Sequence, residues 1–231
     1  MPRIDLSGDR RSDLIVTSPW GLGVVGWNGG ALAATAMCQN GHRMGDWLLD
    51  TAVNRVQLVG DFDGDGRAEA LMSSPWGIGI AAFAGAQTTK AMAQSGTRLG
   101  GWIVDTSNNR FLHAVDVDGD GRAEIVVTSP WGIGLLGLRN GAMTSVTLAA
   151  NGTRLGEWLL NTGDNWIPAV GDVDNQPHLL IERGADRSAL GVPVRDFIDD
   201  LAGTSQRIQR IPSAGSEHAE GSHNGVSNEP L

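Results

Sequence analysis

The sequence predicts an all-β fold made of about three similar blades, each with four short antiparallel strands. Three markers recur every 55 residues or so: an acidic loop, the tetrapeptide Ser-Pro-Trp-Gly, and a Gly-x-Trp segment. A fixed period of this length is typical of solenoids, propellers and arrays, because one repeat cannot bury its apolar face alone. The strands are short and show no helical period, so we expect β-propeller-type repeats in an incomplete or open propeller.

An acidic loop of nine residues opens each unit. The two stronger copies, DFDGDGRAE at residues 61–69 and DVDGDGRAE at 116–124, place carboxylates at loop positions 1, 3, 5 and 9. Glycines at positions 4 and 6 let the backbone turn inward, so that these side chains converge. Calcium takes about six to eight oxygen ligands, and carboxylates this close repel one another without a cation. We therefore expect calcium (Ca2+) in each stronger loop.

The expected ligands include the backbone carbonyl at loop position 7. They are Asp61, Asp63, Asp65, Arg67 and Glu69 in the second loop, and Asp116, Asp118, Asp120, Arg122 and Glu124 in the third. The first loop, DLSGDRRSD at residues 5–13, predicts a weaker site because Arg10 replaces a glycine. Its ligands would be Asp5, Ser7, Asp9, Arg11 and Asp13. A fourth loop begins at Asp172, but Gln176 and Leu180 replace its third and last acids.

The strands of a unit are clearest in the third repeat. An apolar run at residues 124–128 ends at Ser-Pro, since proline cannot donate a hydrogen bond to a sheet. Residues 131–135 alternate bulky side chains with glycine, and Asn140-Gly141 marks a hairpin turn. A strand near 144–149 follows, then the Gly-x-Trp segment. A last strand, like the one near 111–115, leads into the next loop.

Residues 1–183 hold the three units and the start of a degenerate fourth. The first unit begins on its loop and lacks the strand that should precede it, whereas that strand type recurs at residues 165–171. This offset fits a truncated propeller, and it equally fits closure of a ring by a terminal strand. Residues 184–231 read as a non-repeat tail, with a short helix near 194–202 and a disordered Ser- and Gly-rich end.

These motifs resemble the FG-GAP/VCBS repeat family, over roughly residues 1–181. That family includes integrin-like β-propellers and propeller lectins, and its metal motif matches the second and third loops residue by residue. The resemblance implies a calcium-binding module for recognition or adhesion, with a glycan or protein ligand, outside the cell or on its surface. No motif fixes a sugar-binding residue. The alternative is that the chain is a structural spacer or scaffold fragment of a larger secreted or surface protein. Such a spacer could lie beside a catalytic domain of that protein.

Composition excludes several other functions. The net charge is −9 and there is no basic stripe, so we expect no nucleic-acid partner. There is no run of about 20 apolar residues, so we expect no membrane span, and no signal peptide is visible. We expect that the chain is not an enzyme, because its sequence contains no Ser-His-Asp set, nucleophile elbow or phosphate loop. Apolar sides of the terminal blades, with Leu14, Val16, Ile167 and Val170, predict self-association through open blade edges.

Six of the eight tryptophans recur with the period, and we expect these to pack between blades. They are Trp20, Trp76 and Trp131 in the Ser-Pro-Trp-Gly segments, and Trp47, Trp102 and Trp158 in the Gly-x-Trp segments. Trp27 and Trp166 lie outside the period, so they are the better candidates for contact with a ligand.

Overall fold

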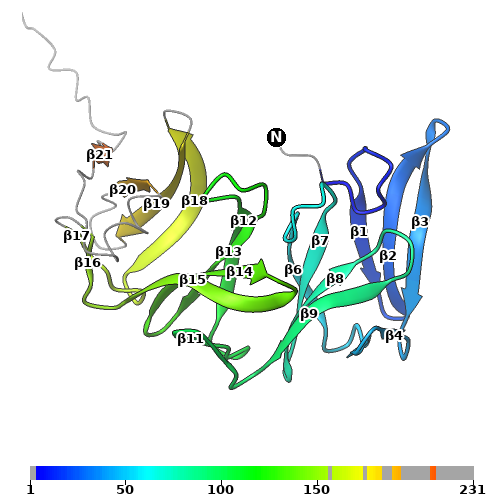
Figure 1. Ribbon diagram of the computed structural model, residues 1–231, viewed down its shortest axis with the longest axis horizontal. Coiled ribbons are helices and arrows are strands. Elements are labelled where there is room, and N and C mark those ends of the chain that lie inside the picture. The colour runs from blue at the N-terminus through cyan, green and yellow to red at the C-terminus, as the bar shows by residue number, and fades with distance from the viewer. Residues whose placement is uncertain (1–3, 156–157, 174–175, 184–188, 194–208, 212–231) are drawn as a thin grey trace, which may run out of the picture.

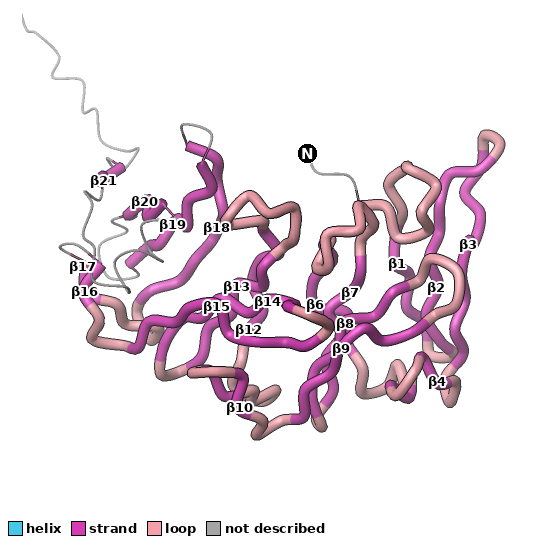
Figure 2. The backbone as a smooth tube through the Cα atoms, viewed as in Figure 1, coloured by secondary structure: helices cyan, strands magenta, loops and turns pink. Residues whose placement is uncertain are grey.

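The computed structural model describes residues 4–155, 158–173, 176–183, 189–193 and 209–211. Within them every regular element is a strand, and each strand pair is antiparallel (Figure 2). Four sheets follow one another in chain order and form an open row, from β1–β3 to β18–β21 (Figure 1). The predicted all-β, β-propeller-type fold is confirmed.

The four sheets and three small hairpins have the following bounds. The first sheet is β1 (Leu14–Ser18), β2 (Gly21–Asn28) and β3 (Ala31–Gln39). The second is β6 (Arg55–Gly60), β7 (Glu69–Ser74), β8 (Gly77–Ala82) and β9 (Thr88–Gln94). The third is β12 (Arg110–Val115), β13 (Glu124–Ser129), β14 (Gly132–Arg139) and β15 (Ala142–Ala150). The fourth is β18 (Asn165–Val173), β19 (Gln176–Arg183), β20 (Ala189–Pro193) and β21 (Gln209–Ile211). The hairpins pair β4 (Arg43–Met44) with β5 (Trp47–Leu48), β10 (Arg98–Leu99) with β11 (Trp102–Ile103), and β16 (Arg154–Leu155) with β17 (Trp158–Leu159).

The strand before each acidic loop belongs to the same sheet as the strand after it. Thus β6 pairs with β7 and β12 with β13, and the inner strands β6, β12 and β18 contact one another in sequence. In the first sheet no described strand takes the place of these inner strands beside β1, as the sequence predicted. From residue 4 onward, the part of this segment that the structure describes, one bond of that pairing is present, from the Asp13 N–H to the Ile4 carbonyl at 2.7 Å.

The apolar residues that the sequence placed on the open sides of the terminal blades differ between the two ends. Leu14 and Val16 on β1 are exposed, as predicted. The prediction is wrong for Ile167, which is 5 % exposed and packs between the third and fourth sheets. The side chain of Val170 lies outside the described residues, and self-association through open blade edges stays a prediction.

The fourth sheet corrects the predicted organisation of the chain. The sequence indicated about three blades and a non-repeat tail from residue 184, whereas β20 and β21 complete a four-stranded fourth sheet. The acidic motif failed as a marker here because β18 and β19 pair directly up to Val173 opposite Gln176, which leaves no room for a nine-residue loop between them. The predicted helix at 194–202 and the end of the tail from residue 212 lie outside the described residues.

Apolar clusters between neighbouring sheets form the core, and a buried tryptophan lies in each. Trp47 and Trp102 are fully buried and Trp158 nearly so. A Cβ on Gly79 or Gly134 would lie 2.7 Å or 2.5 Å from the ring of Trp47 or Trp102, which explains the bare positions of these strands. Each indole N–H is satisfied by an asparagine side chain seven residues later, at 3.0–3.2 Å.

The tryptophans of the Ser-Pro-Trp-Gly segments pack against the preceding repeat where there is one. Trp76 lies 4.5 Å from Trp47 between ring centres, and Trp131 lies 4.4 Å from Trp102. The predicted packing between blades is therefore confirmed for these pairs. It is wrong for Trp20, which is exposed because no described sheet precedes the first one.

Candidate functional site

The second and third acidic loops have the same internal hydrogen bonds. The first aspartate of each loop accepts the N–H groups at loop positions 4 and 6; for Asp61 these are Gly64 at 2.7 Å and Gly66 at 2.8 Å. The buried glutamate at position 9 accepts the N–H at position 2, so Glu69 bonds Phe62 at 2.9 Å and Glu124 bonds its counterpart at 3.1 Å. The glycines at positions 4 and 6 have positive φ, as the turn requires. The two loops therefore share one backbone shape, which these hydrogen bonds stabilise.

Three groups of carboxylates lie close enough to hold a cation. In each group the candidate oxygens, one per residue, lie within 4.8 Å of one another. The groups are Asp61, Asp63 and Glu69; Asp116, Asp118 and Glu124; and Asp5, Asp9 and Asp13. Asp65 and Asp120, predicted as ligands at position 5, are not in these groups. The oxygen-rich donor set suits calcium.

A basic side chain from a neighbouring strand contacts each of the two stronger loops. Lys90, on β9, pairs with Asp63, with Glu69 Oε1 at 3.1 Å and with Asp65 Oδ2 at 3.3 Å. It is the extra residue of a β-bulge between β8 and β9. These contacts supply one tethered positive charge to the second loop.

The third loop receives its charge from a different strand. Arg139 ends β14, and its Nη2 lies 2.6 Å from Glu124 Oε1, 3.4 Å from Asp118 Oδ2 and 3.7 Å from Asp120 Oδ2. Sequence reasoning missed both cations, because Lys90 and Arg139 occupy different positions of the repeat. The one available signal was a basic residue on a strand otherwise made of small and apolar side chains.

The electrostatics of these sites favour a nearby cation. Burial raises the pKa of the Glu69 carboxyl to about 7, although hydrogen bonds from Phe62 and Lys90 oppose the shift. Burial likewise raises the pKa of Glu124. Burial also opposes the charge on Lys90, but hydrogen bonds to Asp63 and Glu69 raise the pKa of Lys90 above its ordinary value. Ionised carboxylates at these depths are costly, and a cation beside them lowers that cost.

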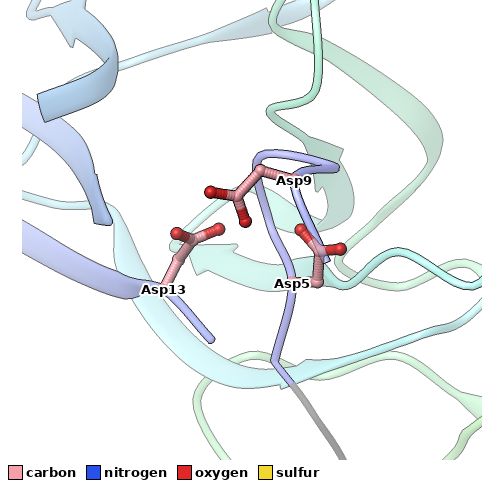
Figure 3. A group of neighbouring side chains, drawn as sticks. All are labelled: Asp5, Asp9 and Asp13. Carbon is pink, nitrogen blue, oxygen red and sulfur yellow. The ribbon is translucent and has the colours of Figure 1, made fainter. Parts of the chain in front are cut away.

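The first loop adopts the same turn without either cation. Its three aspartate side chains point toward a common space (Figure 3). Arg10, at loop position 6, has φ of 67°, close to the 82° of Gly66, so the missing glycine does not alter the turn. The residues that correspond to Lys90 and Arg139 are the uncharged Thr35 and Asn28.

Two buried oxygens in the first loop have no hydrogen-bond partner. Asp13 is 4 % exposed, and its Oδ2 accepts the N–H groups of Leu6 and Ser7 at 2.9 Å and 2.8 Å, but its Oδ1 has no donor. Ser7 Oγ is also without a partner. Buried oxygens that lack a donor are costly, and a bound cation would satisfy them. The first loop therefore fits calcium at least as well as the other two.

Adjacent loops are joined through their backbones. The Ala68 N–H donates to the Asp5 carbonyl at 2.7 Å, and the Ala123 N–H donates to the Asp61 carbonyl at 2.6 Å. The side chain of Arg122 bonds the Asp63 carbonyl at 3.1 Å. Arg122 and Arg67, predicted as carbonyl ligands, thus also extend toward the preceding loop, where Arg67 lies against Gly8. Each loop is therefore bonded to the loop before it.

A groove of about 640 Å3 lies between β1 and β6, beside the first loop. Its walls are mostly apolar, with Leu14 and Ile15 on one side and Val56 and Val59 on the other, and Arg55 lies among them. Asp13 also lines it. The groove occupies the region next to the free edge of β1.

Comparison with known proteins agrees with this geometry. Residues 61–127 match the model of the FG-GAP-like repeat family. No curated protein matches the sequence. One solved structure with a similar fold is an Agrocybe aegerita lectin, described as recognising non-reducing terminal N-acetylglucosamine, with a TM-score of 0.51 and 17 % sequence identity. The match covers 81 % of this chain and 46 % of the lectin chain, so this chain spans less than half of that protein.

At this identity the likeness to the lectin shows a shared fold alone. Within the described residues, no helix is long and apolar enough to cross a membrane. The matched segment contains both of the stronger acidic loops and the β-strands between them. The chain therefore carries an FG-GAP-like repeat on a β-propeller-type fold, as its acidic loops and their spacing predicted.

Proposed function

We propose that this chain is a calcium-stabilised, non-enzymatic recognition or adhesion module, whose ligand is a glycan or a protein surface. The observation that carries the metal assignment is the first loop. Three carboxylates converge there, and two buried oxygens await a donor or a cation. The recognition assignment is supported by the FG-GAP-like repeat, by the fold shared with a lectin, and by the groove beside that loop.

Calcium would act on the shape of the blades rather than on a reaction. The loops are linked through Ala68 and Ala123, so neutralising one loop stabilises the backbone of the loop before it. With a dissociation constant of ~0.1 mM, ~1 mM calcium would add roughly 1.4 kcal/mol of stability per site. Open loops of this kind suit millimolar calcium, which favours a place outside the cell or on its surface.

Calorimetric titration tests the metal assignment. We expect heat of calcium binding at two or three sites per chain, and a higher melting temperature with calcium than with chelator. Magnesium serves as the control, because it demands near-octahedral geometry and keeps its water. The absence of both heat and thermal shift at several millimolar calcium would refute the proposal.

A glycan array separates recognition from the alternative role of a spacer or scaffold. We expect binding to a defined set of glycans that weakens when the groove is blocked by Val59→Trp, because Val59 lines it. The matched control is Leu159→Trp, at an exposed position far along the chain. A chain that binds calcium but neither glycans nor protein partners would be a spacer.

A further inference from the structure

The carboxylates of the second loop use their two oxygens for different partners. In Asp63, Asp65 and Glu69, one oxygen of each carboxylate accepts a backbone N–H of the loop itself. The other oxygen of each contacts the ammonium of Lys90, with Glu69 Oε1 at 3.1 Å and Asp65 Oδ2 at 3.3 Å, and Asp63 Oδ2 is also paired with it. The backbone thus holds these side chains so that their remaining oxygens converge on one point, and the ammonium occupies that point.

The third loop repeats this arrangement with a different basic side chain. Asp118, Asp120 and Glu124 again give one oxygen each to a loop N–H. Their other oxygens lie 3.4 Å, 3.7 Å and 2.6 Å from Arg139 Nη2. Lys90 comes from β9 and Arg139 from the end of β14, so two unrelated positions deliver a charge to the same set of oxygens. This convergence indicates that the loop itself creates the cation position.

The first loop supports the same conclusion by having no such side chain. Thr35 and Asn28 stand where the other repeats have a lysine or an arginine. Asp13 again gives one oxygen to loop N–H groups, those of Leu6 and Ser7. Its other oxygen, Oδ1, is buried and has no donor. The oxygen that meets a basic side chain in the second and third loops is therefore unpaired in the first.

An ammonium and a calcium ion cannot share this point. Calcium binds carboxylate oxygens at about 2.3–2.6 Å, and the oxygens of Asp63 and Glu69 that face inward are those that Lys90 now uses. Each oxygen that the ion takes is one that the lysine loses. A divalent ion and an ammonium this close also repel each other strongly. Occupation of the second loop by calcium therefore requires that Lys90 leave it.

Lys90 is well placed to leave. Its side chain is already 24 % exposed, so rotation of its flexible four-carbon stem is enough to bring the ammonium into solvent. It is also the only lysine of the chain, since the other sixteen of the seventeen basic residues are arginines. A change in the surroundings of this one amine is therefore a change in every lysine that the chain has.

We propose that Lys90 is a tethered counter-ion of the second loop, which calcium displaces and thereby exposes on the surface beside β9. This proposal rests on the calcium binding stated under the proposed function. The calcium-free loop is neutralised from within the chain, whereas the calcium-loaded loop presents an ammonium to its surroundings. Calcium then controls the charge that this end of the second sheet offers to an anionic group of a partner, as well as the stability of the loop.

Acetylation of the intact chain by an N-hydroxysuccinimide ester tests this proposal. The rate of modification of Lys90 is followed by mass spectrometry in several millimolar calcium and in chelator. We expect acetylation at least about tenfold faster in calcium, because charge-assisted hydrogen bonds hold the ammonium in the calcium-free loop. The matched control is Arg98→Lys, which adds a second lysine at an exposed position outside the loops. Its rate should be the same in both media.

Calorimetry of the acetylated chain gives the reciprocal measurement. Acetylation removes the charge of Lys90, so one site should bind calcium at least about tenfold more tightly, since coupling between two sites is reciprocal. Lys90→Arg, treated with the same reagent, has no lysine to modify and should keep its calcium affinity.

The two measurements separate this proposal from the metal assignment. A chain that takes up calcium by calorimetry but acetylates Lys90 equally fast in calcium and in chelator would overturn the displacement and leave the calcium sites standing. Unchanged calcium affinity after acetylation would overturn it as well. A chain that shows no heat of calcium binding at all would refute the metal assignment, and this proposal with it.

Discussion

The first acidic loop and the two that follow balance the same kind of negative charge in different ways. In the second and third loops, Lys90 or Arg139 reaches in from a strand and contacts three carboxylates. In the first loop the corresponding positions hold Thr35 and Asn28, and Asp13 Oδ1 has no partner. The loop with the poorest motif is therefore the one with the most available ligand atoms.

This difference shows that a metal-binding motif identifies the ligand residues but not the basic side chains that compete with the ion for them. The stronger motifs predict tighter calcium sites, yet an ion entering them has to displace a tethered cation from Glu69 or Glu124. In the first loop an ion would not have to displace a side chain equivalent to Lys90 or Arg139. We propose that calcium binds the first loop most tightly, the reverse of the order that the motifs alone suggest.

The largest effect is expected for Lys90→Ala. Without calcium this variant should lose about 2 kcal/mol of unfolding free energy, because the buried Glu69 loses its cationic partner and must either stay ionised without it or take up a proton. Calcium should restore the loss, and calorimetry should show tighter binding at the second loop. Lys90→Arg, the control, should behave as the wild type. Unchanged calcium affinity in Lys90→Ala would mean that the lysine and the ion do not compete.

A smaller effect is expected for Asp13→Asn in the first loop. The amide keeps an oxygen for the Leu6 and Ser7 N–H groups but removes the charge that calcium needs. In calcium the variant should lose roughly 1.4 kcal/mol of the calcium-dependent stabilisation, and in chelator it should be as stable as the wild type or more so. Asp46→Asn, an exposed aspartate outside the loops, is the control. Equal losses in both media would show a structural role alone.

The smallest effect is expected for Arg10→Gly. The left-handed conformation at φ of 67° costs a non-glycine residue about 1–2 kcal/mol, and the greater freedom of glycine in the unfolded chain offsets about 0.4–1 kcal/mol of that. A net gain of about 0.5 kcal/mol should appear in urea unfolding. Arg10→Ala keeps the strain and should give no gain. A destabilised Arg10→Gly variant would show that the arginine side chain itself supports the loop.

Features set by neighbouring residues were predictable from the sequence. The acidic loops, the Asn140-Gly141 turn with both φ angles positive, and the bare strands that receive Trp47 and Trp102 each follow from local patterns. Because each pattern recurs in every repeat, one clear copy allows the weaker copies to be recognised. The all-β class, the repeat period and the candidate metal loops therefore follow from the amino-acid sequence by itself.

The contacts between residues that are distant in the sequence were decided by the tertiary structure alone. Lys90 reaches Asp63 over 27 residues and Arg139 reaches Glu124 over 15, and no periodic signal links such pairs. The fourth sheet formed without its acidic motif, because backbone pairing of β19 with β20 needs only extended strands. Burial of Met72 and exposure of Val16, one repeat apart, depend on which sheet stands beside them. A sequence specifies which side chains a strand presents, and only the folded neighbours determine what those side chains touch.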